Sequence, residues 1–317
     1  MHAHFRGFFL FKGFRMKYSK PHLSFEKQAC YLLSRGLVAD KTKLTKRLKQ
    51  VNYYRLSGYW YPFLNSDDTF KPQTSVEIIW RRYTFDRELR LLLMDAIEKI
   101  EVTIRTRIAY YFSEKYGAFG YQDKGNLPDI NLKEYGDFIS QFSRMTFSSK
   151  ELFVSHFFDK YGDSHHGLPI WMAIELMSFG MMLTFYKGLE QPIRKKIAAD
   201  FGTSEEVFTS WLHSITSIRN MCAHHARLWN KEIGYKPKIP KKRKHPMWHT
   251  PFEIKGDRIF GMVMILKYLL KIVAPNSKWG ERVEKLTDKY NDLPIIKMGF
   301  PPNWKESEIW KAKEIKR

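Results

Sequence analysis

Cysteine is scarce in this sequence. Among 317 residues there are two cysteines, Cys30 and Cys222, which lie far apart and show no zinc-site spacing. Two cysteines form at most one bridge, so a disulfide-rich secreted domain is excluded. Because no secretory signal precedes them, we expect two reduced thiols in a cytoplasmic protein. We also expect no metal ion and no cofactor.

Long apolar runs are missing as well. The most apolar stretch, residues 169–186, carries Glu175 near its centre, whereas a membrane span needs about 20 consecutive apolar residues. We therefore expect a buried core helix in this stretch and no membrane partner.

The familiar catalytic loops are absent too. The sequence contains no glycine-rich phosphate loop, no paired zinc ligands and no nucleophile elbow. Two carboxylates, Glu98 and Glu101, share one predicted helix surface. We interpret them as partners of nearby arginines, because nothing in the pattern places a substrate between them.

Acidic residues are outnumbered by basic ones, 33 against 54, which gives a formal net charge of +21. A surplus of this size usually accompanies a polyanionic partner, and without a membrane span that partner is nucleic acid. Residues 1–60 hold 13 basic and two acidic residues, and residues 231–249 hold seven and one. This concentration favours a binding surface, although a solvated basic face is an alternative. The candidate RNA contacts are Lys41, Lys43, Lys46, Arg47, Lys49, Arg55, Lys236, Lys238, Lys241, Lys242, Arg243 and Lys244.

Apolar residues recur at helical intervals almost throughout, and no alternating run is long enough for a sheet. The sequence therefore predicts an all-α, multi-helix bundle. We divide it into a leader or mis-assigned start (1–15), an N-terminal helical region (16–125), a second helical region (126–275) and a basic C-terminal extension (276–317).

Several helix ends are marked by capping residues. Ser24 and Asp40 are predicted N-caps, and Ser75 opens a helix to about Tyr116 that we expect to break near residues 84–86. Capping boxes are predicted at Ser148 with Glu151, and at Thr203 with Glu206. The second of these opens a helix that runs to about Arg227.

The segment with the clearest chemical potential is residues 217–230. It gathers Arg219, Asn220, His224, His225 and Arg227 within nine residues, at the end of a capped helix. Histidine exchanges protons near neutral pH, and arginine binds phosphate oxygens through its planar fork. These are the groups that cleavage of RNA without a metal requires, namely a base, an acid and a cation.

The spacing within this segment carries a geometric restriction. Arg219 and His224 are five positions apart, so on an ideal helix they diverge by roughly 140°. They converge on one phosphate only if the arginine curls around, the helix deforms, or a second copy of the site completes the cleft. His213, on the same helix, is interpreted as a partly buried structural histidine.

The motif Arg219-Asn220-Met221-Cys222-Ala223-His224 resembles the Arg-Asn-x-x-x-His signature of HEPN ribonucleases. Its continuation through Asn230 is similar to the Abi family of bacterial abortive-infection proteins, the AbiD/AbiF group. The resemblance covers roughly residues 17–235. It also rests on residues 23–37 (LSFEKQACYLLSRGL), 51–63 (VNYYRLSGYWYPF), 85–89 (FDREL) and 175–180 (ELMSFG).

The resemblance implies an all-α, HEPN-like ribonuclease toxin of an anti-phage system that cuts RNA without a metal. Such proteins commonly pair as homodimers, and members of the group are associated with a structured noncoding RNA that acts as antitoxin. By position, Arg219 and His224 take the catalytic roles and Asn220 orients them, with His225 and Arg227 as auxiliary residues. A buried Glu175 facing Arg219 would fix its orientation, or would be a plain internal ion pair.

Other interpretations stay open. A non-catalytic RNA-binding sensor or scaffold would use the same motif to grip phosphate, and a DNA-binding regulator is weaker because no helix-turn-helix pattern is evident. The aromatic segment around Tyr53-Tyr54-Arg55 and Tyr59-Trp60 offers rings for stacking on unpaired bases. In a chain this rich in aromatics, the favoured interpretation of that segment is core packing.

Overall fold

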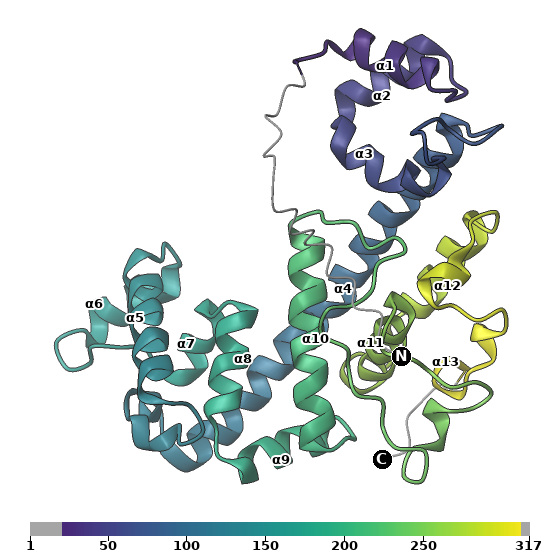
Figure 1. Cartoon of the computed structure of the whole chain (residues 1–317). Coiled ribbons are helices and arrows are strands. Elements are labelled where there is room, and N and C mark those ends of the chain that lie inside the picture. The colour runs from purple at the N-terminus through teal and green to yellow at the C-terminus, as the bar shows by residue number, and fades with distance from the viewer. Residues whose placement is uncertain (1–20, 312–317) are drawn as a thin grey trace, which may run out of the picture. The chain divides into compact units, whose positions relative to one another are not determined.

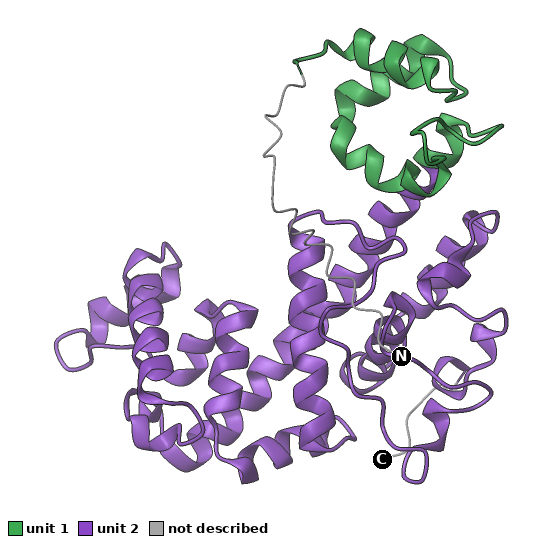
Figure 2. Cartoon of the chain, in the orientation of Figure 1, with its two compact units in different colours: residues 1–80 green, residues 81–317 purple. Residues whose placement is uncertain are grey.

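A computed structural model describes residues 21–311, so the expected leader at residues 1–15 lies outside the described residues. Thirteen α-helices and no β-strand occur in this range, which confirms the all-α prediction. The chain separates into two compact units, residues 1–80 and 81–317 (Figure 2). None of the helices in residues 21–311 is long and apolar enough to cross a membrane.

Unit 1 is built from three short helices, α1 (Phe25–Ser34), α2 (Lys41–Gln50) and α3 (Tyr53–Trp60), and contains the start of α4 (Val76–Tyr116) (Figure 1). The predicted N-caps are confirmed. The Ser24 hydroxyl accepts from the Lys27 N–H at 3.3 Å, and the Asp40 carboxylate accepts from the Lys43 N–H at 2.7 Å. The core of the unit is formed by aliphatic side chains of these helices, including Leu32, Leu44, Leu48 and Leu56.

Helix α4 is continuous, so the break predicted near residues 84–86 is wrong. No proline or glycine occurs in the helix, and the Thr84 hydroxyl bonds back to the Arg81 carbonyl at 3.0 Å instead of interrupting it. Apolar residues recur along α4 every three or four positions, and this stripe is buried along its whole length. Its members are Leu89, Leu93, Ile97, Ile100, Ile104 and Ile108.

The remaining helices of unit 2 follow α4 in the chain. They are α5 (Leu132–Ser148), α6 (Leu152–Tyr161), α7 (Ile170–Leu176), α8 (Phe179–Gly188), α9 (Gln191–Asp200), α10 (Glu205–Ala223), α11 (Ile259–Val273), α12 (Trp279–Lys289) and α13 (Glu308–Lys311). Helix α10 contacts α8 and α9, and also α11, the most apolar helix of the unit (Figure 1). It therefore lies in the middle of unit 2.

The apolar stretch at residues 169–186 forms two helices rather than the single core helix expected. Helix α7 ends before Met177, whose backbone is extended, and Ser178 caps α8. The cause is distant in sequence. The buried guanidinium of Arg105 in α4 donates to the carbonyls of Ile174, Glu175 and Met177, at 2.6, 2.9 and 2.7 Å. These carbonyls thereby gain partners outside the helix.

Both predicted capping boxes are wrong. Ser148 is the last residue of α5, and α6 starts after Glu151 without a side-chain cap. Helix α10 is capped by Ser204, whose hydroxyl accepts from the Val207 N–H at 3.4 Å, rather than by Thr203. The N-cap position of α6 is thus occupied by Glu151 instead of Ser148, and that of α10 by Ser204 instead of Thr203.

Candidate functional site

Helix α10 ends earlier than the sequence predicts. His224 is the C-cap and His225 has φ 54°, a left-handed conformation that few residues other than glycine adopt. The His225 N–H donates to the Cys222 carbonyl at 3.0 Å and the Ala226 N–H to the Met221 carbonyl at 2.8 Å. These two bonds make a Schellman cap. The Arg-to-His motif therefore occupies the last helical turn, and His224 is exposed on the cap.

The segment that follows the cap is bound to α4. The fully buried carboxylate of Asp86 accepts from the Leu228 N–H at 3.2 Å and from the Trp229 N–H at 2.7 Å. Arg90 pairs with Asp86 at 2.5 Å and donates to the Ala226 carbonyl at 3.3 Å. A buried, charge-assisted network thus fixes the backbone directly after His224. Sequence reasoning noted the segment around Asp86 only as part of the resemblance and gave it no role.

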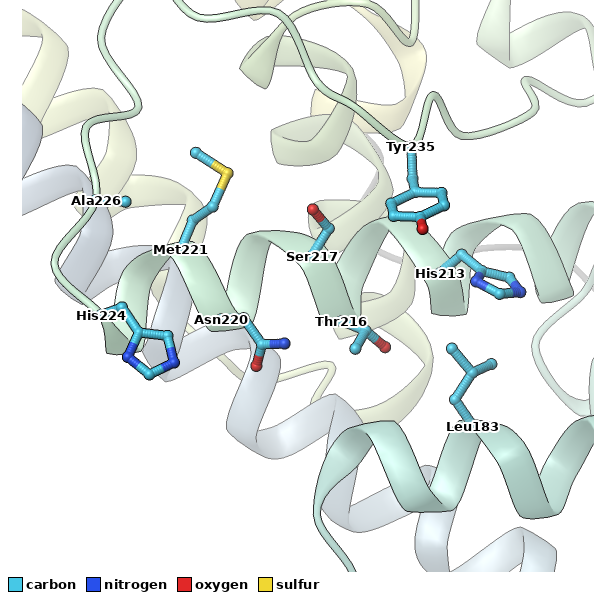
Figure 3. Close-up of a pocket in the computed structure, with 9 residues that line it drawn as sticks. All are labelled: Leu183, His213, Thr216, Ser217, Asn220, Met221, His224, Ala226 and Tyr235. Carbon is cyan, nitrogen blue, oxygen red and sulfur yellow. The ribbon is translucent and has the colours of Figure 1, made fainter. Parts of the chain in front are cut away.

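A pocket of about 530 Å³ runs along one face of α10 (Figure 3). Asn220 and His224, one helical turn apart, project to the same side of the helix. Leu183 of α8 and Tyr235 of the loop after α10 line the other end of the pocket, next to His213 and Thr216. The nine lining residues are Leu183, His213, Thr216, Ser217, Asn220, Met221, His224, Ala226 and Tyr235. The pocket therefore combines an amide, two imidazoles and three hydroxyl groups.

Arg219 does not line this pocket. This agrees with the divergence of roughly 140° that the helical spacing predicts. The side chain is half-buried, and its Nε is shielded from water without a hydrogen-bond partner in residues 21–311. An unsatisfied buried N–H costs about 1–3 kcal/mol, so Arg219 carries a donor whose hydrogen bond is not made in this structure.

Glu175 does not orient Arg219. It is exposed in α7, and no ion pair joins it to Arg219 in the described part of the chain, so the expectation of a buried Glu175 is wrong. The buried pair near this position is Glu101 with Arg105 in α4. The interpretation of Glu101 as an arginine partner is thus confirmed. That of Glu98 is wrong, since Glu98 is exposed and makes no ion pair within residues 21–311.

The two auxiliary candidates lie beside the pocket rather than in its wall. His225 is exposed at the left-handed position, and Arg227 is half-buried. His213, by contrast, lines the pocket and stacks on Tyr235, with ring centroids 5.8 Å apart. Partial burial, together with the charge of Lys187, lowers the pKa of His213. Its partial burial was predicted, but its place in the pocket depends on a loop that the helical pattern does not reveal.

The basic loop 236–244 is attached to the first half of α10. The Trp211 indole donates to the Lys238 carbonyl at 2.8 Å, and the Lys238 N–H donates to the Ser210 hydroxyl at 2.9 Å. The Lys238 ammonium also pairs with Glu206. From Glu206 to His224 the helix advances 18 positions, roughly 27 Å. The basic loop and the motif therefore lie toward opposite ends of one helix.

The predicted RNA contacts are mostly exposed. In the loop, Lys236, Lys241, Lys242, Arg243 and Lys244 are exposed and make no ion pair within residues 21–311. In unit 1, Lys43 and Arg47 pair with Glu77, and Lys49 pairs with Glu26 at 3.3 Å. The exposed lysine pairs contribute about 0–1 kcal/mol each, so they compete weakly with phosphate, whereas the Arg47 side chain is largely buried. Lys41, Lys46 and Arg55 are also exposed on this unit.

Both cysteines are free, Cys30 exposed and Cys222 buried in α10. Burial raises the pKa of the Cys222 thiol to about 12. In residues 21–311 no group of three or more His, Cys, Asp or Glu side chains is placed to hold a metal ion.

Comparison with known proteins places this chain in a family. No curated protein and no solved structure matches it. A family described as Abi-like protein matches residues 46–230, which is more than half of the chain and includes α4, α10 and the segment after His224. The matched range thus contains both Asp86 and the Arg-to-His motif. The chain belongs to the Abi-like protein family.

Proposed function

We propose that this chain is a metal-independent endoribonuclease of the HEPN type, acting as the toxin of an abortive-infection system against phage. The observation that carries the proposal is the geometry of the last turn of α10. Asn220 and His224 line a pocket, while Arg219 on the adjacent face has a buried N–H without a partner. Membership of the Abi-like family and the resemblance of the motif to HEPN ribonucleases support it.

The proposed chemistry is transfer of a phosphodiester within the RNA. A histidine takes the proton of a ribose 2′-OH, and O2′ attacks the phosphorus. The P–O5′ bond breaks, and a second proton donor protonates the leaving O5′. The products are a 2′,3′-cyclic phosphate and a 5′-hydroxyl. His224 fits either proton role, and the Arg219 guanidinium stabilises the charge that develops on the phosphate.

One chain supplies these groups on diverging faces. Two chains related by a twofold axis beside the C-terminal ends of their α10 helices would bring two arginines and two histidines to one cleft. One histidine would then act as base and the other as acid. We therefore propose a homodimer as the active species, with Asn220 orienting the pair and His225 and Arg227 in auxiliary positions.

The basic surfaces support a second RNA partner. The exposed cations of α2 and of loop 236–244 extend beyond what one scissile phosphate needs. Following the resemblance, we propose that a structured noncoding RNA binds them and holds the toxin in check. Phosphate contacts of this kind contribute affinity that depends on salt.

A cleavage assay tests the proposal. The purified full-length chain is incubated with RNA in the presence and absence of a chelator, and the end groups of the products are identified. We expect that the chelator leaves cleavage unchanged and that the products carry 2′,3′-cyclic phosphate ends. The His224→Ala chain serves as control. RNA that is bound but left intact would favour the alternative of a non-catalytic RNA-binding sensor or scaffold.

A further inference from the structure

Unit 1 contains a pocket of about 730 Å³ that the proposed cleavage does not use. Its wall is formed mainly by aromatic side chains of α1, α3 and the turn after α3. They include Phe25, Tyr31, Tyr53, Tyr54, Trp60 and Tyr61. The volume lies within the range of small-molecule and cofactor sites, about 300–1,000 Å³. The polar residues Gln28, Arg35, Asn52, Ser57 and Asp68 also line it.

The aromatic residues of this segment divide into two groups. Tyr59 and Trp60 are 1% and 2% exposed, so the expectation of core packing is confirmed for them. Tyr54 and Tyr61 are 67% and 76% exposed, although both line the pocket. Packing inside unit 1 therefore does not account for these two rings. Exposed rings at the rim of a pocket are suited to stacking on a planar ligand.

One polar group in the wall lacks a partner. The Gln28 amide nitrogen donates to the Leu23 carbonyl at 2.9 Å, which fixes the orientation of the amide because a carbonyl only accepts. The Gln28 Oε1 is consequently directed elsewhere, and it is buried without a donor.

Basic residues lie around the pocket, and the acid in its wall, Asp68, pairs with Arg35 at 3.7 Å. The Arg35 guanidinium lies 5.3 Å from the centre of the Tyr31 ring, and the Lys49 ammonium lies 5.9 Å from the centre of the Phe25 ring. Helix α2, which packs on α1, carries five Lys and Arg residues and no acid. An occupant with a negatively charged backbone is favoured by these charges.

We infer that this pocket binds an unpaired nucleotide of an RNA strand, with the base stacked on Tyr54 and Tyr61 and the phosphates next to the cations of α2. A planar base with an anionic backbone matches both the exposed rings and these cations, whereas an apolar small molecule matches the rings alone. This binding site is separate from the proposed cleavage, because holding the nucleotide involves no chemical step. It makes RNA recognition partly dependent on bases rather than on charge alone.

The inference is tested by RNA binding to the full-length His224→Ala chain, so that cleavage does not interfere. Fluorescence anisotropy compares a short single-stranded oligoribonucleotide with the same oligomer carrying abasic sites. Stacking of one base contributes about 1–3 kcal/mol, so Tyr54→Ala should weaken binding of the intact oligomer about 5- to 160-fold. It should leave the abasic oligomer, already weak, almost unchanged. The slope of affinity against salt should stay the same, because no phosphate contact is lost.

Two variants serve as controls. Tyr54→Phe keeps the ring and should retain binding. Tyr110→Ala removes a tyrosine of unit 2 that is 58% exposed, against 67% for Tyr54, and should have no effect. Because Tyr54 is exposed, its removal should leave the melting temperature unchanged. Equal weakening of intact and abasic oligomers, or no weakening by Tyr54→Ala, would overturn the inference. The separate cleavage assay keeps this result distinct from failure of the proposed nuclease.

Discussion

The carboxylate of Asp86, in the long helix α4, accepts a hydrogen bond of 2.7 Å from the backbone N–H of Trp229, five residues after His224. The same carboxylate pairs with Arg90, which in turn donates to the Ala226 carbonyl. Asp86 is thereby bonded to Leu228 and Trp229, which lie 142 and 143 positions later in the sequence. The C-terminal cap of α10, and with it the orientation of His224, depends on a buried charge in another helix.

Asp86→Ala should destabilise unit 2 strongly. The substitution leaves the Arg90 guanidinium buried without its carboxylate and removes the acceptor of two backbone N–H groups. Loss of one partner of a buried pair costs about 3–5 kcal/mol. Urea denaturation measures the loss in the free energy of unfolding. Glu98→Ala, an exposed carboxylate of the same helix, should change it by less than about 0.5 kcal/mol. Similar stability of both variants would contradict the anchoring role of Asp86.

His224→Ala should reduce RNA cleavage by at least about a hundredfold, because one positioned proton-transfer group contributes about 10²–10⁴-fold. His224 is exposed, so the melting temperature should change little. Arg219→Lys should also fail to cleave, since an ammonium does not replace the planar fork of a guanidinium. Toxicity in cells that survives His224→Ala would show that the chain is not the proposed nuclease.

The oligomeric state tests the composite site. In light scattering we expect a particle of twice the 37.9 kDa chain mass, plus any bound RNA. Mixing His224→Ala with Arg219→Ala chains should give little rescue if all four residues serve one phosphate. Partial rescue would mean that each cut uses the arginine of one chain and the histidine of the other. A monomer that is fully active at working concentration would contradict the homodimer.

Neutralising Lys241 and Lys242 to glutamine should weaken RNA binding and flatten its dependence on salt. Each lost phosphate contact lowers the slope of log K against log salt by about 0.7–0.9. Lys133 and Lys150, exposed lysines outside both basic segments, give a control with the same change in charge. If the two double variants have the same slope, loop 236–244 is a solvated arm.

The thiols of Cys30 and Cys222 should differ in their reactivity toward a thiol reagent at pH 8. Burial raises the pKa of Cys222 to about 12, so its thiol stays protonated at pH 8, and the thiolate is the reactive form. Titration of the native chain with a thiol reagent at pH 8 should therefore label one cysteine, the exposed Cys30. Cys30→Ser should label none until the chain is unfolded. Rapid labelling of Cys222 in that variant would show that the end of α10 opens readily.

Features that depend on neighbouring residues could be predicted from the amino-acid sequence. The helical class, the caps at Ser24 and Asp40 and the buried stripe of α4 follow from hydrogen bonds and apolar spacing within a few positions. The divergence of Arg219 from His224 also follows from helical geometry, and it agrees with the absence of Arg219 from the pocket wall.

The tertiary structure alone decided which partners meet over long distances. The apolar stretch at residues 169–186 divides into two helices where Arg105, some 70 positions earlier, donates hydrogen bonds to its backbone carbonyls. Helix α10 ends next to a segment whose backbone N–H groups bond to Asp86. Leu183 and Tyr235 complete the pocket from a separate helix and a loop. Such contacts depend on the packing of the whole chain, because a buried charge bonds with whichever polar backbone groups the fold brings to it.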